Sequence, residues 1–278
     1  MHHKNPTQVF LIIHPGTLGD VVLALPAIQL IRRQFSDHEL VLLVREPIGK
    51  LLLKFGLVDR VINMEGLVLA QLLSDDPCFG DGVGEIMDRC HHVVAWVTDC
   101  DGKLAMNLER LGIEQRWIMS PHNGLLRSYH QSDRYLETLG FLTHDVFQHE
   151  ILLSSQCALR PNKPLFLPDD SRKSDDPKSI FIHPSSGSLH KCWPPLKMAT
   201  LIQQLIQGKK GKVILCQGPG DNAIISELQS CLRAVNYKII KDADLVEISQ
   251  LLKMVDLYIG FDSGVTHLAA ALGIPTIA

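Results

Sequence analysis

Three segments of the chain place glycines and chemically active side chains where an apolar run gives way to a helical pattern. The last segment reads FDSGVTHLAAALGIP, over residues 261–275. Asp262, Ser263 and Gly264 stand where the helix should begin, and free N–H groups and the helix dipole favour a phosphate at such a position. His267, in the first turn, would add a hydrogen-bond donor. A helix cap formed by Asp262 or Ser263 is the plainer alternative.

The first segment reads HPGTLGDVVLALP, over residues 14–26. Its glycines, Gly16 and Gly19, allow a tight turn and a close approach of the backbone to a substrate. Asp20 follows where the helix dipole favours an ionised carboxylate, so we expect it to act as a general base towards a hydroxyl. An N-cap role is the alternative. The spacing does not match the dinucleotide pattern G-x-G-x-x-G, and Pro26 is expected to kink or restart the helix.

The middle segment reads IHPSSGSLHKCWPP, over residues 182–195. Ser185 and Ser186 could form a polar turn that donates hydrogen bonds to phosphate oxygens. Lys191 would add a positive charge that neutralises a leaving diphosphate. The alternative is an ordinary loop whose Trp193 packs on the core. The spacing of a Walker A loop is absent.

A fourth strand-to-helix turn, CQGPGD, ends at Asp221. Asp221 could accept hydrogen bonds from ribose hydroxyls, as acidic residues do in nucleotide sites, and a plain helix cap is equally consistent with its position. A metal site is not expected, because Cys90, His91 and His92 lack the spacing of a standard zinc site. A serine hydrolase is not expected either, since Ser263 is not in a G-x-S-x-G elbow.

Short apolar runs and helical patterns alternate on both sides of these segments. Strands are predicted over residues 9–13, 40–44, 61–63, 93–97 and 117–119, and again over 180–183, 213–217, 237–240, 255–259 and 276–277. Helices are predicted over residues 20–34, 47–55, 66–74, 82–88, 103–111 and 132–139, then over 195–207, 221–232, 245–254 and 264–272. This rhythm predicts two α/β domains with parallel sheets, whose carboxyl edges border a cleft.

The segment over residues 159–178 is rich in proline and charge and is expected to be a linker. It separates a domain over residues 1–158 from a second over 179–278. The chain stops at Ala278 inside a strand candidate, so the second domain is expected to be truncated.

Composition narrows the functional class. With 46% hydrophobic residues, 21% charged residues and a net charge of −3, the chain has no basic surface of the kind that nucleic acids or anionic membranes attract. Seven cysteines without framework spacing suggest a reducing compartment. The apolar run over residues 9–13 is too short for a signal sequence or a transmembrane segment. A cytoplasmic protein is expected.

Taken together, the segments resemble glycosyltransferase family 9, the heptosyltransferases that build the inner core of bacterial lipopolysaccharide. The resemblance depends on Leu18-Gly19-Asp20 with Leu25-Pro26, on Lys191-x-Trp193-Pro194, and on Asp262-Ser263-Gly264-x-x-His267-Leu268-Ala269 followed by Ala271-Leu272-Gly273-Ile274-Pro275. It implies a GT-B fold, two Rossmann-like domains that face across a cleft, with no metal. The N-terminal domain would bind the acceptor and the C-terminal domain the nucleotide sugar.

The resemblance also implies roles for single residues. Asp20, next to Gly19, would be the base that deprotonates the acceptor, and Lys191 would stabilise the departing diphosphate. The other donor contacts would fall on Ser185, Ser186, Asp221, Asp262, Ser263, Gly264 and His267. Some family members carry a glutamate where this chain has Asp221, and the shorter side chain weakens the case for that contact.

The expected reaction is an inverting, metal-independent transfer of heptose from ADP-heptose to a lipid-linked saccharide at the inner membrane surface. No cofactor besides the donor substrate and no nucleic-acid partner are expected. Two alternatives remain open. One is a GT-B relative that uses another nucleotide sugar, as a transferase or an epimerase, and the other is a catalytically inactive glycosyltransferase-like protein.

Overall fold

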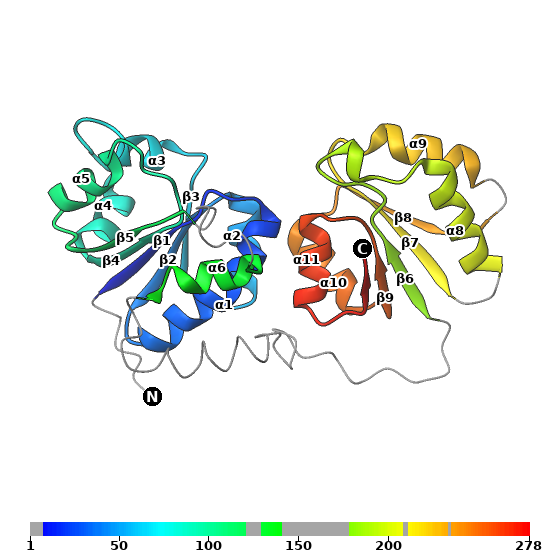
Figure 1. Ribbon diagram of the computed structural model, residues 1–278, viewed down its shortest axis with the longest axis horizontal. Coiled ribbons are helices and arrows are strands. Elements are labelled where there is room, and N and C mark those ends of the chain that lie inside the picture. Colours follow the sequence, from blue (N-terminus) through cyan, green and yellow to red (C-terminus); the bar gives the residue numbers. More distant parts are fainter. Residues whose placement is uncertain (1–7, 121–128, 141–177, 208–210, 233–234) are drawn as a thin grey trace. The chain divides into compact units, whose positions relative to one another are not determined.

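The computed structural model describes residues 8–120, 129–140, 178–207, 211–232 and 235–278 (Figure 1). The chain divides into two compact units, Met1–Leu152 and Leu153–Ala278, called here the N-terminal and the C-terminal unit. Each contains one five-stranded parallel sheet, which confirms the predicted α/β class. The predicted linker over 159–178 lies, except for residue 178, outside the described residues, so its boundaries stay a prediction.

The sheet of the N-terminal unit has the strand order β3-β2-β1-β4-β5. Its strands are β1 (Val9–Ile13), β2 (Glu39–Val44), β3 (Arg60–Asn63), β4 (Cys90–Ala95) and β5 (Gln115–Ile118). Every residue of β1 and β2 is buried, as expected for parallel strands covered on both faces. The sequence prediction for β1 is confirmed at both ends, and the other four are confirmed with small shifts in their bounds.

The helices of this unit also follow the predicted pattern. They are α1 (Leu18–Gln34), α2 (Glu46–Lys54), α3 (Leu67–Leu72), α4 (Asp81–Asp88), α5 (Lys103–Arg110) and α6 (Gln131–Glu137). Of the predicted kink or restart at Pro26, the restart is wrong, because α1 runs through Pro26 without interruption, and the kink stays a prediction. Proline removes one backbone donor, but the neighbouring Leu25 and Ala27 are buried in the core, and this packing holds the helix together.

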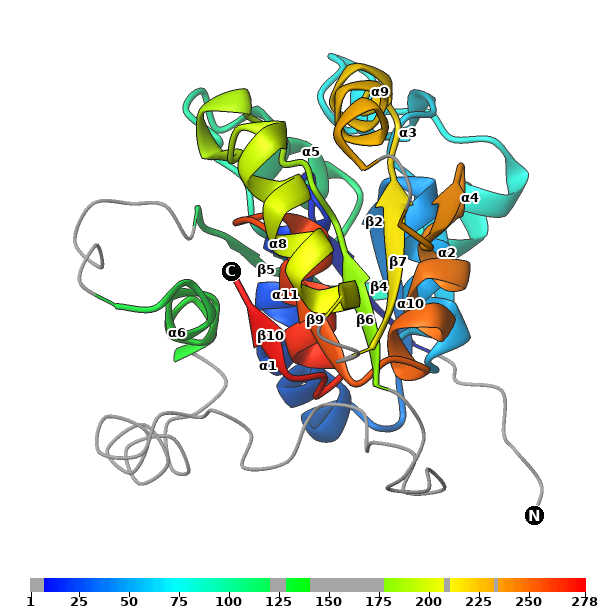
Figure 2. The ribbon, with the colours of Figure 1, turned by 90° about the vertical axis from the view of Figure 1, so that its right-hand side faces the viewer.

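The sheet of the C-terminal unit has the order β10-β9-β6-β7-β8. Its strands are β6 (Ser179–Ile182), β7 (Lys212–Gln217), β8 (Lys238–Lys241), β9 (Leu257–Ile259) and β10 (Thr276–Ile277). The helices are α8 (Pro195–Gln207), α9 (Asn222–Cys231), α10 (Leu245–Lys253) and α11 (Gly264–Ala271), with a short 3₁₀ helix, η3 (Leu189–Lys191), after β6. Contacts join α8 to α9, α8 to β7 and α10 to α11, and Figure 2 shows β6 and β7 side by side.

Both sheets have the same topology when their strands are counted along the chain, namely 3-2-1-4-5. The direction of winding therefore reverses between β1 and β4 in one unit and between β6 and β9 in the other. In sheets of this kind ligands bind outside the carboxyl ends of the strands at that reversal. Three of the predicted segments follow β1, β6 and β9, so they lie at these two points.

Within the described parts of the chain, no helix combines the length and the apolar composition that crossing a membrane requires.

Candidate active site

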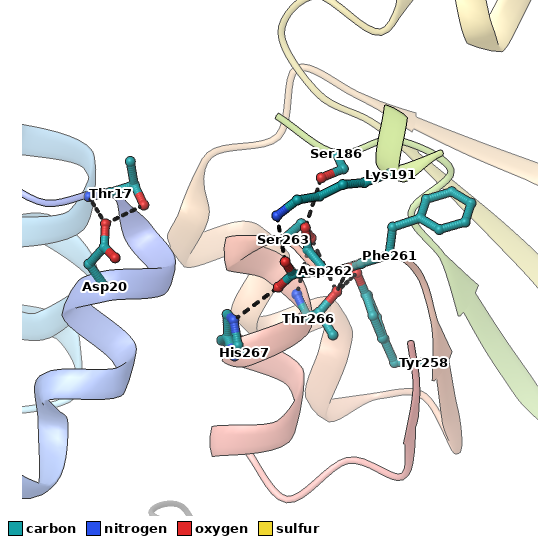
Figure 3. A network of polar contacts seen from close by, with 10 residues as sticks. All are labelled: Thr17, Asp20, Ser186, Lys191, Tyr258, Phe261, Asp262, Ser263, Thr266 and His267. Carbon is teal, nitrogen blue, oxygen red and sulfur yellow. Dashed lines mark hydrogen bonds and ion pairs between the residues drawn. The ribbon is translucent and has the colours of Figure 1, made fainter. Parts of the chain in front are cut away.

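In the N-terminal unit, the turn between β1 and α1 holds Asp20 in a defined position (Figure 3). Asp20 Oδ2 accepts hydrogen bonds from the backbone N–H of Thr17 and from Thr17 Oγ1, both at 2.8 Å. Thr17 is the N-cap of α1, so the alternative of Asp20 as N-cap is wrong, although Asp20 still closes the first turn from its third position. Within the described residues, Asp20 Oδ1 has no hydrogen-bond partner, and the side chain is only partly buried.

Three buried aromatic rings, those of His14, Trp96 and Tyr135, pack next to this turn. His14 is 2% exposed, and its Nδ1 accepts a hydrogen bond from the N–H of Gly16 at 3.1 Å. The His14 ring lies 5.4 Å from the rings of both Trp96 and Tyr135, measured between centroids. Burial and the nearby charge of Asp20 raise the pKa of Tyr135, which therefore stays a neutral phenol. The rings of Trp96 and Tyr135 are also in contact, with 5.1 Å between centroids, so the three rings pack together next to the turn that carries Asp20.

In the C-terminal unit, three charged side chains meet in front of α11 (Figure 3). Lys191 Nζ donates a hydrogen bond to Asp262 Oδ2 at 2.5 Å, and His267 Nε2 lies 3.5 Å from Asp262 Oδ1. Ser186 Oγ donates to the backbone carbonyl of Asp262 at 2.8 Å. The hydrogen bond from Lys191, followed by the charges of Lys191 and His267, lowers the pKa of Asp262. Lys191 and Asp262 are more than half exposed, so a ligand can reach them.

The first turn of α11 carries no acidic residue. Ser263 is its N-cap, and Ser263 Oγ accepts a hydrogen bond from the N–H of Thr266 at 3.4 Å. Of the two candidate caps, Ser263 is thus the one that caps the helix. Asp262 instead contacts Lys191 and His267, and these three residues are called here the charged group. Gly264 is the first residue of the helix and adds a backbone N–H without a side chain.

Thr266 ties this helix start to the core. Thr266 Oγ1 donates a hydrogen bond to the carbonyl of Phe261 and lies 3.0 Å from the hydroxyl of Tyr258. Burial raises the pKa of Tyr258 to about 12. A Cβ atom on Gly260 would collide with the Tyr258 hydroxyl, so glycine is required where the chain leaves β9.

Ser185 and Asp221 belong to a separate, buried cluster. Asp221 Oδ2 accepts a hydrogen bond from the N–H of Gly218 at 2.7 Å and lies 3.7 Å from His183 Nε2. The same imidazole nitrogen lies 3.3 Å from Ser185 Oγ. A Ser-His-Asp catalytic triad uses both nitrogens of the histidine, so this cluster is not one. Ser185 is 3% exposed in this cluster, and its predicted donor contact stays a prediction.

Trp193 is exposed, and the alternative in which it packs on the core is wrong. Its indole is 53% exposed and touches Phe261 only edge-on, with 6.2 Å between ring centroids. Phe261 already fills the core position beneath it, because it is 7% exposed and packs within the hydrophobic cluster of the C-terminal unit. The exposed Trp193 therefore belongs to the surface next to Lys191.

The structure brings six predicted residues of the C-terminal unit together at the reversal between β6 and β9. They are Ser186, Lys191, Asp262, Ser263, Gly264 and His267. Asp20 and the buried Gly19 lie in the first turn of α1 in the N-terminal unit, and Ser185 and Asp221 form the buried cluster.

Sequence reasoning missed the functional parts played by Thr17, His183 and Thr266. For Thr17 a signal existed, because threonine three residues before an acid at a helix start is the pattern of a capping box. Thr266, three residues after Ser263, offered a similar signal. His183 gave none, since its contact with Asp221 joins distant parts of the sequence.

No group of three or more histidine, cysteine or acidic side chains that could hold a metal ion occurs in the described part of the chain. Cys90 lies buried in β4, and burial raises its pKa to about 12. His92 stacks against Phe10. These contacts give both side chains a structural role.

The two sites differ in what they can do. In the C-terminal unit, Lys191, His267 and the N–H groups at the start of α11 form an anion site suited to a diphosphate. In the N-terminal unit, Asp20 offers one anchored carboxylate whose Oδ1 has no partner among the described residues, which suits a general base.

Comparisons with known proteins identify the family of the chain. The family model described as glycosyltransferase family 9 (heptosyltransferase) matches residues 138–278, slightly more than half of the 278-residue chain. Lipopolysaccharide heptosyltransferase 1 of Campylobacter coli is 24% identical over 279 residues, which cover 96% of this chain and 82% of that protein.

Two further relatives match over shorter stretches. Lipopolysaccharide heptosyltransferase 3 of Escherichia coli is 29% identical over 102 residues, or 36% of this chain and 30% of its own length. A protein of Haemophilus influenzae is 32% identical over 117 residues, or 42% of this chain. The chain spans only 34% of the length of that relative.

Solved structures share the fold. The glycosyl transferase family 9 protein of Veillonella parvula matches with a TM-score of 0.69 at 15% identity, over 98% of this chain and 81% of its own. Escherichia coli heptosyltransferase WaaC with ADP-2-deoxy-2-fluoro heptose matches with a TM-score of 0.65 at 15% identity, over 97% of this chain and 87% of its own. The likeness confirms the predicted GT-B class with two Rossmann-like domains.

The matched region contains Lys191, Asp262 and His267, the charged group found in front of α11. Because the family model covers more than half of the chain, this chain belongs to glycosyltransferase family 9, the heptosyltransferase family.

Proposed function

We propose that this chain transfers heptose from ADP-heptose to a saccharide acceptor of the lipopolysaccharide inner core, with inversion at the anomeric carbon and without a metal ion. One observation carries the proposal: Lys191 and His267 gather at the start of α11, where the fold places ligands and the first turn carries no acid. The names of the relatives support the sugar and the acceptor. One is a lipopolysaccharide heptosyltransferase, and another was solved with an ADP-heptose analogue.

The reaction would be a direct displacement. Asp20 accepts the proton of an acceptor hydroxyl through Oδ1, the hydroxyl oxygen attacks the anomeric carbon, and the bond from that carbon to the diphosphate oxygen breaks. The ADP leaving group gains negative charge, which Lys191 and the N–H groups of α11 stabilise. One carboxylate is sufficient, whereas glycoside hydrolysis uses a pair of them.

The remaining predicted contacts would divide between the two substrates. Ser263, Gly264 and His267 would hold the phosphates, and Asp262, once a phosphate takes over Lys191, could accept hydrogen bonds from sugar hydroxyls. Ser186 would fix the turn that presents Asp262. Gly19 lies beside Asp20 and would allow the acceptor to approach the backbone. The acceptor would be lipid-linked and held at the inner membrane surface.

A transfer assay tests the proposal. The purified chain is incubated with heptose-deficient lipopolysaccharide and with ADP-heptose, UDP-sugars or GDP-sugars in turn, and the mass of the acceptor and the released nucleotide are measured. Gain of one heptose with equal release of ADP supports the proposal. Transfer from another nucleotide sugar indicates a different transferase, and conversion of a sugar nucleotide without acceptor indicates an epimerase. Binding without turnover indicates an inactive relative.

A further inference from the structure

A buried polar cluster lies under the proposed nucleotide site, apart from the charged group in front of α11. His183, Ser185 and Asp221 are 8%, 3% and 9% exposed. The first two follow β6, and Asp221 follows β7, the strand paired with β6. The cluster therefore joins the loop that leads to Lys191 with the turn that opens α9.

Two hydrogen bonds between Asp221 and Gly218 close the turn over residues 218–221. The Asp221 N–H donates to the carbonyl of Gly218 at 3.2 Å, and Asp221 Oδ2 accepts from the N–H of Gly218 at 2.7 Å. Pro219 and Gly220, the latter at a φ of 88°, occupy the middle of the turn as in a type II turn. A Cβ atom on Gly218 would lie 3.1 Å from Asp221 Oδ2, so glycine permits the close approach.

Polar neighbours stabilise the charge of the Asp221 carboxylate inside the protein. Burial would raise the pKa of Asp221, but the nearby His183 and Ser185 side chains and the hydrogen bond from the Gly218 N–H outweigh it and lower the pKa. A buried carboxylate is tolerated only when such partners are present. The Asp221 side chain is only 12% exposed and its Oδ2 is already occupied by the Gly218 N–H, so the turn leaves little of the carboxylate open to a ribose hydroxyl.

We propose that His183 and Asp221 are positioning residues that clamp the β6 loop to the β7 turn, and that Asp221 does not contact the ribose of the donor. The inference deepens the proposed function and relies on it for the choice of ligand. The clamp fixes the Gly218–Asp221 turn against the loop that carries Ser186 and Lys191. The donor would then be held by the phosphate group, with little selection for the ribose 2′-hydroxyl.

The test compares ADP with 2′-deoxy-ADP by calorimetric titration of the wild type, Asp221→Asn and Glu227→Gln. Glu227 is exposed on the same helix and serves as a matched control. Asp221→Asn should weaken ADP binding several-fold while leaving the ratio of the two dissociation constants unchanged within about twofold, because the clamp acts on both ligands alike. The inference is overturned if the wild type binds 2′-deoxy-ADP about tenfold or more weakly than ADP and Asp221→Asn binds the two ligands equally. A difference of about tenfold is the loss expected when a hydrogen bond to a charged group is removed.

His183 variants test the clamp independently of any ligand. His183→Ala and Asp221→Asn should each lower the melting temperature, the double variant should lose less than the sum, and His183→Gln should recover part of the loss because its amide can replace Nε2 as a donor. Additive losses contradict the clamp. If no variant, nor the wild type, binds ADP, the proposed function fails, while the melting temperatures still decide whether the clamp exists.

Discussion

The two units share one topology but differ at the equivalent position, because the first helical turn carries an acid in one unit and none in the other. In the N-terminal unit the helix at the reversal, α1, has an acid of its own in the first turn, Asp20, which accepts the hydrogen bonds of Thr17. In the C-terminal unit the helix at the reversal, α11, has a neutral cap, Ser263, and no acid in its first turn.

This difference explains why the start of α1 suits a general base and the start of α11 suits a bound anion. The carboxylate of Asp20 already complements the positive end of α1, so a phosphate would be repelled there. At α11 the acid lies one residue before the cap, and Lys191 and His267 offset its charge. Two sheets of the same topology thus differ in their chemistry because of single side chains at the start of one helix in each unit.

The largest expected effect is on turnover. Asp20→Asn should lower the transfer rate about 10²–10⁴-fold, the usual contribution of a general base, and leave the dissociation constant of ADP unchanged. Steady-state assays with calorimetry measure both quantities. The matched variant Thr17→Val removes only the hydroxyl donor to Asp20 and keeps its backbone donor, so its loss should be smaller. Unchanged turnover of ADP-heptose by Asp20→Asn would show that the base lies elsewhere.

Lys191→Met, in contrast, should weaken ADP binding as well as turnover. We expect about 10–100-fold weaker ADP binding, the range for hydrogen bonds to charged groups, together with lost turnover. Lys197→Met is the control, because Lys197 is an exposed lysine on α8, near in sequence but outside the charged group. If both variants bind ADP as the wild type does, the anion site has been wrongly assigned.

A pair of glycine variants sharpens the comparison. Gly260→Ala forces a methyl group against the fully buried Tyr258 and should destabilise the C-terminal unit by about 1–3 kcal/mol, as overpacking does. Gly16→Ala puts a Cβ 2.6 Å from that of Asp20, so it should also displace the base and reduce turnover. Thermal melting and transfer assays separate the two effects. A Gly16→Ala variant that keeps full turnover would mean that the turn tolerates movement of Asp20.

The smallest effect concerns acid titration. The pKa of Asp262 lies below the ordinary value of 3.8, mainly through Lys191. The interaction is therefore complete above the unfolded value and is lost only as the pH falls through the lower folded value. Lys191→Met should move the midpoint of Asp262, followed by carbon NMR of its carboxyl group, upward towards 3.8, while Lys197→Met should not. Equal midpoints in all three proteins would argue against the ion pair in solution.

Much of the fold was predictable from the sequence because parallel strands and amphipathic helices carry long apolar patterns. The bounds of β1 and α8 were predicted at both ends. The continuation of α1 through Pro26 was not, since it depends on the core around the helix. Propensity describes a local preference, and tertiary packing overrides it here.

The candidate site was predictable only where its chemistry lies within one turn. Ser263 and Gly264 were placed correctly because a helix start fixes its own geometry. The contact of Asp221 with His183 joins the ends of two strands, and no short-range pattern reports it. The exposure of Trp193 likewise follows from Phe261 occupying the core beneath it.

Calorimetric titration of ADP into the wild type, Asp20→Asn and Lys191→Met tests most directly whether Asp20 acts only in catalysis while Lys191 binds the diphosphate. The account predicts the same dissociation constant for the wild type and Asp20→Asn, and one about 10–100-fold larger for Lys191→Met. Equal affinities in all three proteins, or no binding of ADP to the wild type, would contradict it.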